Sequence, residues 1–259
     1  MTSAPTFAAD TPLVADIHAS PNHEPRRGGP PDLLLLHYTG VDTTARAIDW
    51  LSRPESKVSC HYVVDLDGRI TQMVPESRRA WHAGVAVWAG ETDINSRSIG
   101  IEIHNPGHSL GYPDFPDAQI AAVIALCQDI LARNPIPPTR VLGHSDVAPL
   151  RKIDPGEKFP WPRLAAAGIG YVVPPAEEVA DPGYGSGSGG PVVAAVQADL
   201  ARIGYGVFPT GSMDPLTVAV VAAVQRRHRP ARVDGRLDLG TRETIRRVLA
   251  ATTGAEAVA

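Results

Sequence analysis

Two histidines and one aspartate of this sequence have the residue types and the setting of a metal site. His37 ends the apolar run Leu33–Leu36, and His144 follows the short apolar segment Arg140–Leu142 after a single glycine. Asp154 stands ten residues beyond His144. Two imidazoles and one carboxylate can be the three ligands of a catalytic zinc ion, which keeps its fourth position for water. Because the spacing contains no close pair of ligands, the prediction depends on a fold that brings the two segment ends together.

A metal-dependent hydrolase also needs a proton acceptor and a group that stabilises the developing oxyanion. Glu102 is the candidate base, because it takes the polar position in the alternating segment Ser-Ile-Gly-Ile-Glu-Ile. Lys152 precedes Asp154 by two residues, so both side chains point the same way if this segment is extended. Taken singly, the residues have ordinary alternatives: a satisfied strand-edge histidine for His37, a solvated ion pair for Glu102 and a surface lysine for Lys152.

These candidates lie in a region where predicted strands and helices alternate. The predicted strands are Leu33–Leu36, His61–Asp65, Arg69–Val74, Ser98–Ile103 and Arg140–Leu142. The predicted helices are Thr43–Leu51 and Asp117–Ala132. Asp67-Gly68 is a hairpin signal between the second and third strands, and Asp117 is the expected N-cap of its helix. The pattern indicates an α/β fold with a mixed central sheet flanked by helices, in which strand ends build the site.

Proline and glycine mark a boundary in the second half of the chain. The strongest cluster, Val173–Pro191, is Pro-rich and then Gly/Ser-rich, as a linker would be. Three amphipathic segments follow it and predict a small all-α, three-helix domain: Val192–Ile203, Leu216–Arg229 and Arg242–Leu249. We therefore expect an N-terminal arm at 1–30, a catalytic domain at 31–172, a linker at 173–190 and a second domain at 191–252.

The second domain contains an internal repeat. Gly211–Thr217 aligns with Gly235–Thr241, 24 residues later, with glycine, aspartate and threonine at equivalent positions and Met213 opposite Leu237. In each copy the glycine suits a turn and the aspartate can cap the following helix. The repeat therefore predicts two units of a turn and a helix. His228, which stands among arginines on the second of these helices, is expected to be exposed to solvent.

The composition limits the class of protein. Hydrophobic residues at 43% and charged residues at 20% exclude wholesale disorder, and a net charge of −4 argues against nucleic-acid binding. The two cysteines, Cys60 and Cys127, cannot form a disulfide framework and are expected to be buried. The longest apolar runs are too short for a membrane span, and no signal peptide is visible. We expect the cytoplasm as the compartment, with the periplasm or cell envelope as the alternative.

Five motifs taken in order resemble a known family. They are LLLLHYTG, VSCHYVVDLDGRITQMV, RAWHAGVAVW, INSRSIGIEIHNPG and VLGHSDVAPLRKIDPG. Together, over roughly residues 30–165, they are similar to the zinc-dependent N-acetylmuramoyl-L-alanine amidases of the amidase-2 type, which share a fold with peptidoglycan recognition proteins. The segment at about 191–250 resembles the three-helix peptidoglycan-binding module that often accompanies such enzymes.

The resemblance implies an activity and roles for the candidate residues. His37, His144 and Asp154 would hold Zn²⁺, Glu102 would be the catalytic base and Lys152 would stabilise the oxyanion. The bond hydrolysed would be the amide between N-acetylmuramic acid, in its 1,6-anhydro form or not, and L-alanine of peptidoglycan or a muropeptide. Aromatic, imidazole and amide groups suit contacts with sugar and peptide, and the candidates for the cleft wall are Tyr38, Trp81, His82, His104 and Asn105. We expect a monomer.

Two other functions are compatible with these residues. A peptidoglycan-recognition protein without catalytic activity could share the fold, although such proteins typically lose the metal ligands that this chain retains. A zinc peptidase that cuts within the stem peptide could use the same metal and base. The substrate form is also open: absence of a leader favours soluble anhydro-muropeptides, whereas a peptidoglycan-binding module favours the intact wall.

Overall fold

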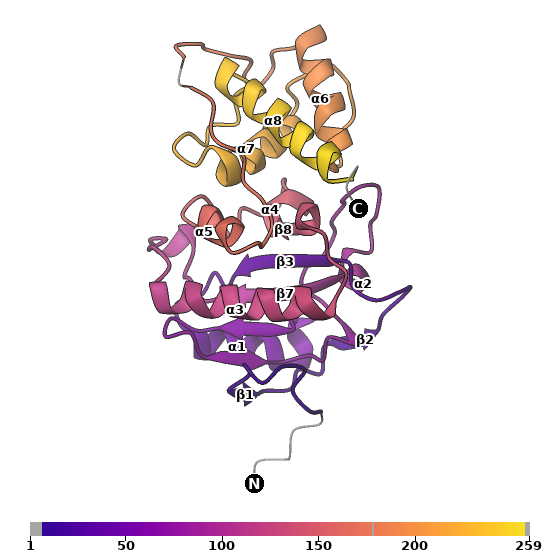
Figure 1. The fold of residues 1–259 in the computed structure, drawn as a ribbon, viewed down its shortest axis with the longest axis vertical. Helices are drawn as coiled ribbons and strands as arrows, with labels where there is room; N and C mark the ends of the chain where they lie inside the picture. Colours follow the sequence, from indigo (N-terminus) through magenta and orange to yellow (C-terminus); the bar gives the residue numbers. More distant parts are fainter. Residues whose placement is uncertain (1–6, 178, 257–259) are drawn as a thin grey trace. The chain divides into compact units, whose positions relative to one another are not determined.

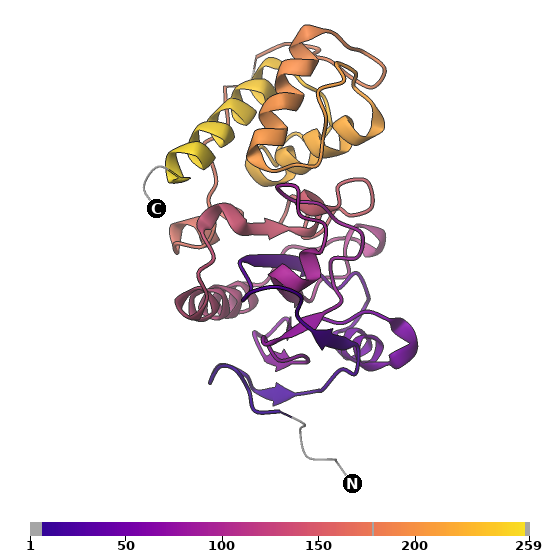
Figure 2. The same ribbon diagram turned by 90° about the vertical axis from the view of Figure 1, so that its right-hand side faces the viewer.

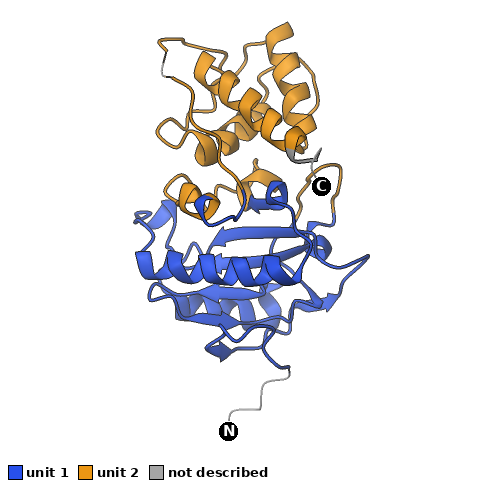
Figure 3. Cartoon of the chain, in the orientation of Figure 1, with its two compact units in different colours: residues 1–84, 93–143, 166–170 blue, residues 85–92, 144–165, 171–259 orange. Residues whose placement is uncertain are grey.

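The structure is a computed structural model that describes residues 7–177 and 179–256, the side chains of 255 and 256 excepted. The first six residues of the predicted arm and Glu178 of the predicted linker lie outside the described residues. The described chain forms two compact units, which Figure 3 distinguishes by colour. Unit 1 comprises the described residues of 1–84, 93–143 and 166–170, and unit 2 those of 85–92, 144–165 and 171–259. The domain boundaries expected from the sequence stay a prediction.

A six-stranded mixed sheet forms the centre of unit 1 (Figure 1). In spatial order its strands are β1 (Asp16–Ile17), β5 (Ile70–Gln72), β4 (Tyr62–Val64), β7 (Ser98–Ile103), β3 (Leu33–Tyr38) and β8 (Val141–Gly143). Strands β4, β7, β3 and β8 run parallel to one another, whereas β4 and β5 form the predicted antiparallel hairpin. The first four residues of β3 are fully buried, as a central parallel strand requires.

Helices cover both faces of this sheet. Figures 1 and 2 show α1 (Thr44–Ser52) on one face and α3 (Asp117–Arg133) on the other. On the α1 face, Ile48 and Leu51 pack against Val63 and Met73 of the sheet region. These layers confirm the predicted α/β fold class. Among the helices in the described ranges, none combines the length and the apolar character needed to cross a membrane.

Several elements of the structure differ from those predicted from the sequence. Helix α3 begins at Asp117, and Pro116 occupies the N-cap position without a side-chain hydrogen bond, so Asp117 is not the cap. The N-terminal arm expected at 1–30 contains β2 (His23–Pro25), which pairs with β6 (Arg78–Ala80) in a two-stranded sheet. Two short elements, α2 (Ile94–Arg97) and α4 (His144–Val147), were not anticipated.

Helices dominate unit 2, and the predicted repeat is present in them. The helices are α4, most of α5 (Trp161–Ala166), α6 (Pro191–Ile203), α7 (Pro215–His228) and α8 (Leu239–Glu256). Asp214 accepts a hydrogen bond from the Thr217 N–H at 2.8 Å, and Asp238 accepts one from the Thr241 N–H at 2.6 Å. The two turn glycines have φ values of 74° and 68°, a region that favours glycine. The prediction of two turn-plus-helix units is confirmed.

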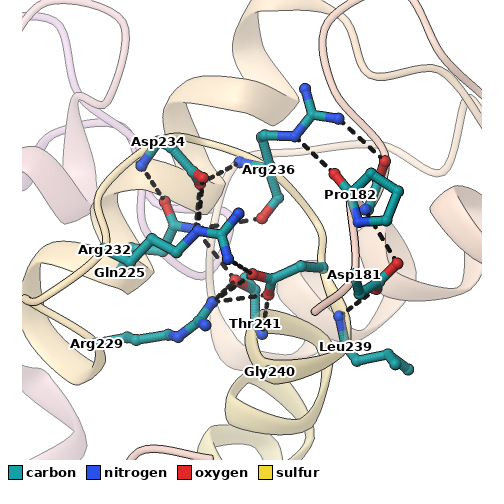
Figure 4. Close-up of polar contacts among 12 residues, drawn as sticks. Asp181, Pro182, Gln225, Arg229, Arg232, Asp234, Arg236, Leu239, Gly240 and Thr241 are labelled. Atoms are coloured by element: carbon teal, nitrogen blue, oxygen red, sulfur yellow. Dashed lines mark hydrogen bonds and ion pairs between the residues drawn. The ribbon is translucent and has the colours of Figure 1, made fainter. Parts of the chain in front are cut away.

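Glutamines extend the repeat beyond what the sequence alignment suggested. Gln197 and Gln225 are both buried, and each amide fastens a loop to the first turn of the next helix. The amide nitrogen of Gln197 donates to the hydroxyls of Thr210 and Thr217 and to the Ser212 carbonyl. The amide nitrogen of Gln225 donates to the side chains of Asp234 and Thr241 and to the Arg236 carbonyl. Figure 4 shows the second set of contacts. In the same region Arg229 forms a buried ion pair with Asp238 at 2.7 Å.

Candidate metal centre

Parallel pairing brings the candidate residues to one edge of the sheet. Strand β3 lies between β7 and β8, and both run parallel to it, so the carboxyl ends of all three strands meet. His37 is in register with Glu102 of β7, and the two side chains therefore point to the same face. Leu36 of β3 is in register with Gly143 of β8, and His144 is the next residue. The strand ends on which the prediction depended do come together.

Asp154 returns to His144 through a loop. The carboxylate oxygen Oδ2 of Asp154 lies 3.1 Å from Nδ1 of His144, and the Ser145 N–H donates to the Asp154 carbonyl at 3.0 Å. Each of His37, His144 and Asp154 can offer a ligand atom such that all three atoms lie within 4.8 Å of one another, and all three residues are buried. A buried carboxylate beside two imidazoles is a donor set that suits zinc and leaves a position for water. These residues therefore fit the metal.

His82 supports the first of these ligands from behind. Its Nδ1 lies 3.0 Å from Nε2 of His37, and its Nε2 lies 3.3 Å from the hydroxyl of Ser98, which donates to the Ile94 carbonyl at 2.7 Å. This contact occupies Nε2 of His37. His82 was expected in the cleft wall, but the structure places its buried side chain against the ligand.

Gly100 makes room for this arrangement. Ser98, Gly100 and Glu102 alternate along one face of β7, and the ring of His82 crosses that face over the glycine. A Cβ atom at position 100 would lie only 2.5 Å from Nδ1 of His82. Nothing in the local sequence around Gly100 indicates that a ring packs on it.

An aromatic cluster follows the end of β3. The hydroxyl of Tyr38 lies 3.1 Å from Nδ1 of His108, whose ring stacks on Tyr112 at a centroid distance of 4.0 Å. The Tyr38 ring also excludes a side chain at position 107, where a Cβ would approach it to 2.6 Å. His108 and Tyr112 were missed from the sequence because they lie in a loop without periodicity. Their only signal was two aromatic rings in a stretch rich in glycine and proline.

The remaining predicted residues have less uniform positions. His104 and Asn105 are buried, with Nδ1 of His104 3.0 Å from the Thr39 hydroxyl and the Asn105 amide donating to the Pro113 carbonyl at 2.8 Å. Burial lowers the pKa of His104. Trp81 is half-buried, and its indole nitrogen has no hydrogen-bond partner among the described residues. Lys152 is half-buried in the loop that leads to Asp154, and no strand is assigned there, so its role stays a prediction.

The cysteines are buried as expected and lie outside the ligand set. Burial raises the pKa of Cys127 to about 12. Burial, and secondarily the charge of Glu102, raise the pKa of Cys60 well above its ordinary value. Neither thiol is therefore ionised near neutral pH, in agreement with the role of small apolar residues.

Fold and site together define a hydrolase of the α/β class with a His-His-Asp centre. The chain belongs to the N-acetylmuramoyl-L-alanine amidase family, whose pattern it matches over residues 27–157. Residues 189–245 match the peptidoglycan binding domain family. The protein is thus an enzyme that hydrolyses the amide between N-acetylmuramic acid and L-alanine, as the motifs predicted.

Relatives and solved structures agree with this assignment. The N-acetylmuramoyl-L-alanine amidase AmiD of Escherichia coli K12 is 40% identical over 223 residues, covering 81% of this chain and 79% of AmiD. The 1,6-anhydro-N-acetylmuramyl-L-alanine amidase AmpD of Enterobacter cloacae is 38% identical over 42% of this chain and 56% of AmpD.

Two of the similar structures contain a muropeptide. The structure of E. coli AmiD with the substrate anhydro-N-acetylmuramic acid-L-Ala-D-gamma-Glu-L-Lys has a TM-score of 0.72 at 32% identity, covering 95% of this chain and 93% of that one. The structure of AmpDh3 from Pseudomonas aeruginosa in complex with anhydromuramic pentapeptide has a TM-score of 0.69 at 28% identity, covering 95% and 97%.

Proposed function

We propose that this amidase holds zinc on His37, His144 and Asp154 and acts on muropeptides that carry 1,6-anhydro-N-acetylmuramic acid. The observation that carries the metal assignment is the buried set of three ligand atoms within 4.8 Å of one another. When bound, zinc supplies Lewis-acid activation of the attacking water and the scissile carbonyl. The remaining chemistry is assigned to side chains around this set.

Glu102 is the proposed general base and acid. It is half-buried and in register with His37, so its carboxylate stands on the face that carries the ligand. It would accept a proton from the attacking water and return it to the nitrogen of L-alanine as the amide breaks. Lys152, two residues before Asp154, would place its ammonium group on the developing oxyanion.

Substrate contacts are proposed for the aromatic cluster. The half-buried rings of Tyr38 and His108 lie at the end of β3, with the buried Tyr112 ring packed against them, and flat rings of this kind suit the faces of a sugar ring. Trp81 adds a buried N–H donor. The side chains of His104 and Asn105 hold the surrounding loops in place, because they bond to the Thr39 hydroxyl and the Pro113 carbonyl.

The anhydro sugar is proposed because similar structures of AmiD and AmpDh3 contain anhydromuramyl peptides. The match to a peptidoglycan-binding domain supports attachment to the polymer as well, so the intact wall is the second candidate substrate. Comparing release of L-Ala-headed peptide from an anhydro-muropeptide and from purified sacculi decides between them. The cytoplasm, with the envelope as alternative, and a monomeric state stay predictions that cell fractionation and light scattering test.

The decisive variant for the mechanism is Glu102→Gln, which keeps the shape of the side chain and removes its basicity. Turnover of an anhydro-muropeptide should fall by about 10²–10⁴-fold. Zinc content, measured by elemental analysis, should stay at the wild-type level. Glu55→Gln makes the same change at an exposed position and serves as the control. Turnover near that of the wild type in Glu102→Gln would remove Glu102 from this role.

The products identify the bond that is cut. Mass spectrometry of the wild-type reaction should show a sugar with a free lactyl carboxylate and a peptide that begins with L-alanine. A sugar that retains L-alanine would instead indicate a peptidase acting within the stem peptide.

A further inference from the structure

The motif that carries His144 is bonded to the C-terminal helical region, which we define as residues 189–256. Asp146 follows His144 by two residues in α4 and is buried. The hydroxyl of Tyr205, just beyond α6, donates to Oδ1 of Asp146 at 2.8 Å. Nη1 of Arg227, on α7, lies 3.7 Å from Oδ2 of the same carboxylate. All these residues belong to unit 2, and each is no more than 5% exposed.

Arg227 is held in place by aromatic rings and a carbonyl. Its guanidinium lies 4.2 Å from the ring centroid of Trp161 and 5.0 Å from that of Tyr171. It also donates twice to the Tyr171 carbonyl, at 3.2 and 2.9 Å. Removing one partner of a buried ion pair leaves a charge without compensation, so this arrangement tolerates little movement of Asp146.

Helix α4 depends on such contacts for its position. Four residues make a single turn, and an isolated turn is unstable because nucleation of a helix is costly. The Ser145 N–H is bonded to the carbonyl of the ligand Asp154, and the Val147 carbonyl accepts from the Val87 N–H at 2.8 Å. Trp88, the next residue after Val87, packs edge-on against Tyr205 with a centroid distance of 5.0 Å.

We propose that Tyr205 and Arg227 are positioning residues of the metal centre. They fix the carboxylate of Asp146 and, through the single turn of α4, the direction of the His144 imidazole. The C-terminal helical region then completes the metal site in addition to any contact with peptidoglycan. This inference rests on the proposed zinc site.

The test compares zinc release from full-length holoenzyme variants. Tyr205→Phe removes one oxygen atom from the Asp146 contact, and Arg227→Met removes the guanidinium at similar length. Both should release zinc to a chromogenic chelator about 10–100-fold faster than the wild type, as is typical for residues that orient metal ligands. With zinc in excess, kcat should fall more than KM rises, because the substrate contacts are on other elements.

Matched controls separate positioning from general destabilisation. Tyr184→Phe removes a hydroxyl from a tyrosine of the same unit whose ring lies 5.9 Å from the Arg242 guanidinium. Arg229→Met breaks the buried ion pair with Asp238, and so destabilises the helical region at a different place. Both controls should release zinc at the wild-type rate.

Each outcome bears on a definite claim. A wild-type protein that holds no zinc overturns the proposed metal site itself. A wild-type protein that holds zinc while both variants release it at the wild-type rate overturns this inference alone. Release from Arg229→Met as fast as from Arg227→Met also overturns it, because the effect would then be loss of stability. If Arg227→Met does not fold, Tyr205→Phe, a change of one atom, carries the test.

Discussion

The imidazole of His82 connects a metal ligand to the sheet that carries it. Its two ring nitrogens contact His37 on one side and the hydroxyl of Ser98 on the other. Ser98 donates its proton to the Ile94 carbonyl, so it accepts from Nε2 of His82 and the Nδ1 of that ring faces His37 as an acceptor. His37 then carries its proton on Nε2, and Nδ1 would be its ligand atom for the proposed zinc ion. Such outer partners fix both the tautomer and the direction of a ligand.

Gly100→Ala should disturb the contacts that run from Ser98 through His82 to His37, without changing any of the three proposed metal ligands. The new methyl group would lie 2.5 Å from the His82 ring, which must move away from His37. We expect zinc affinity to fall about tenfold or more, as for other changes behind a ligand. Competition with a chelator of known affinity measures it. Gly29→Ala, where an added Cβ meets nothing within 4 Å, is the control, and equal affinity in both variants would contradict the role of His82.

His228 shows how burial changes a residue that the sequence placed in solvent. The expectation of exposure is wrong: the side chain is 3% exposed, and the Val173 N–H donates to its Nδ1 at 3.3 Å. Burial, and secondarily the charge of Arg227, hold its pKa well below 6.5. Arginines beside it in sequence suggested a polar helix face, but that face packs inside unit 2.

This burial predicts a pH dependence of stability. The folded protein keeps His228 neutral, whereas the unfolded chain binds a proton there below about pH 6.5. Stability should therefore be lost as the pH falls through the unfolded pKa, by about 1–2 kcal/mol for this group between pH 7 and 5. Urea unfolding at several pH values measures it. His228→Gln should show a shallower decline, and a decline as steep as in the wild type would rule out this contribution.

At the scale of elements, local pattern predicted the long ones and missed the short ones. Strands β3 and β7 and helix α3 have enough residues for their periodicity to appear in the sequence. Strands β2 and β6 have three residues each and exist because distant segments pair, as His23 does with Ala80. No local signal marks such pairing.

The candidate site divides in the same way. The three candidate ligands could be picked out because each stands at the end of a recognisable apolar segment or in a motif of the family, and the structure brings them together. The supporting contacts could not, because they join residues far apart in sequence: His37 with His82, and Asp146 with Tyr205. The role of His82 depends on the space above Gly100, which only the packed structure reveals.

An aspartate caps the helix in both copies of the repeat, but only the second aspartate is also part of a buried ion pair. Asp214 is half-buried and caps α7 through the Thr217 N–H. Asp238 makes the equivalent bond to Thr241, but it is fully buried and also paired with Arg229 at 2.7 Å. The second aspartate therefore neutralises a buried charge in addition to capping a helix.

Substitution of the two aspartates should consequently have unequal effects. Asp214→Ala should lower the free energy of unfolding by about 1 kcal/mol, the usual cost of a lost cap. Asp238→Ala should lower it by about 3–5 kcal/mol, because Arg229 is left buried without its partner. Urea denaturation followed by circular dichroism compares them. Equal losses in the two variants would show that the ion pair adds nothing to the cap.

At the scale of the whole molecule, family boundaries and physical units do not coincide. The amidase match ends at residue 157, yet residues 144–165 belong by their contacts to the same compact unit as the C-terminal helices. Two of the three proposed metal ligands lie in that stretch. Proline and glycine between 173 and 191 mark where the sequence changes character, and the contacts of Asp146 with Tyr205 and Arg227 join segments on either side of it.

Zinc binding should therefore stabilise the folded chain as a whole. The ligands stand at positions 37, 144 and 154, and no preformed site exists in the unfolded chain, so binding favours the folded state. At a free zinc concentration 100 times the Kd the gain is about 2.7 kcal/mol, and for a chain of this size the unfolding temperature should rise by about 5–10 °C. Differential scanning calorimetry of chelator-treated protein, with and without added zinc, measures the shift. His144→Ala should lose most of this zinc-dependent shift, because only two of the three proposed ligands remain. A full zinc-dependent shift in that variant would place the metal elsewhere in the chain.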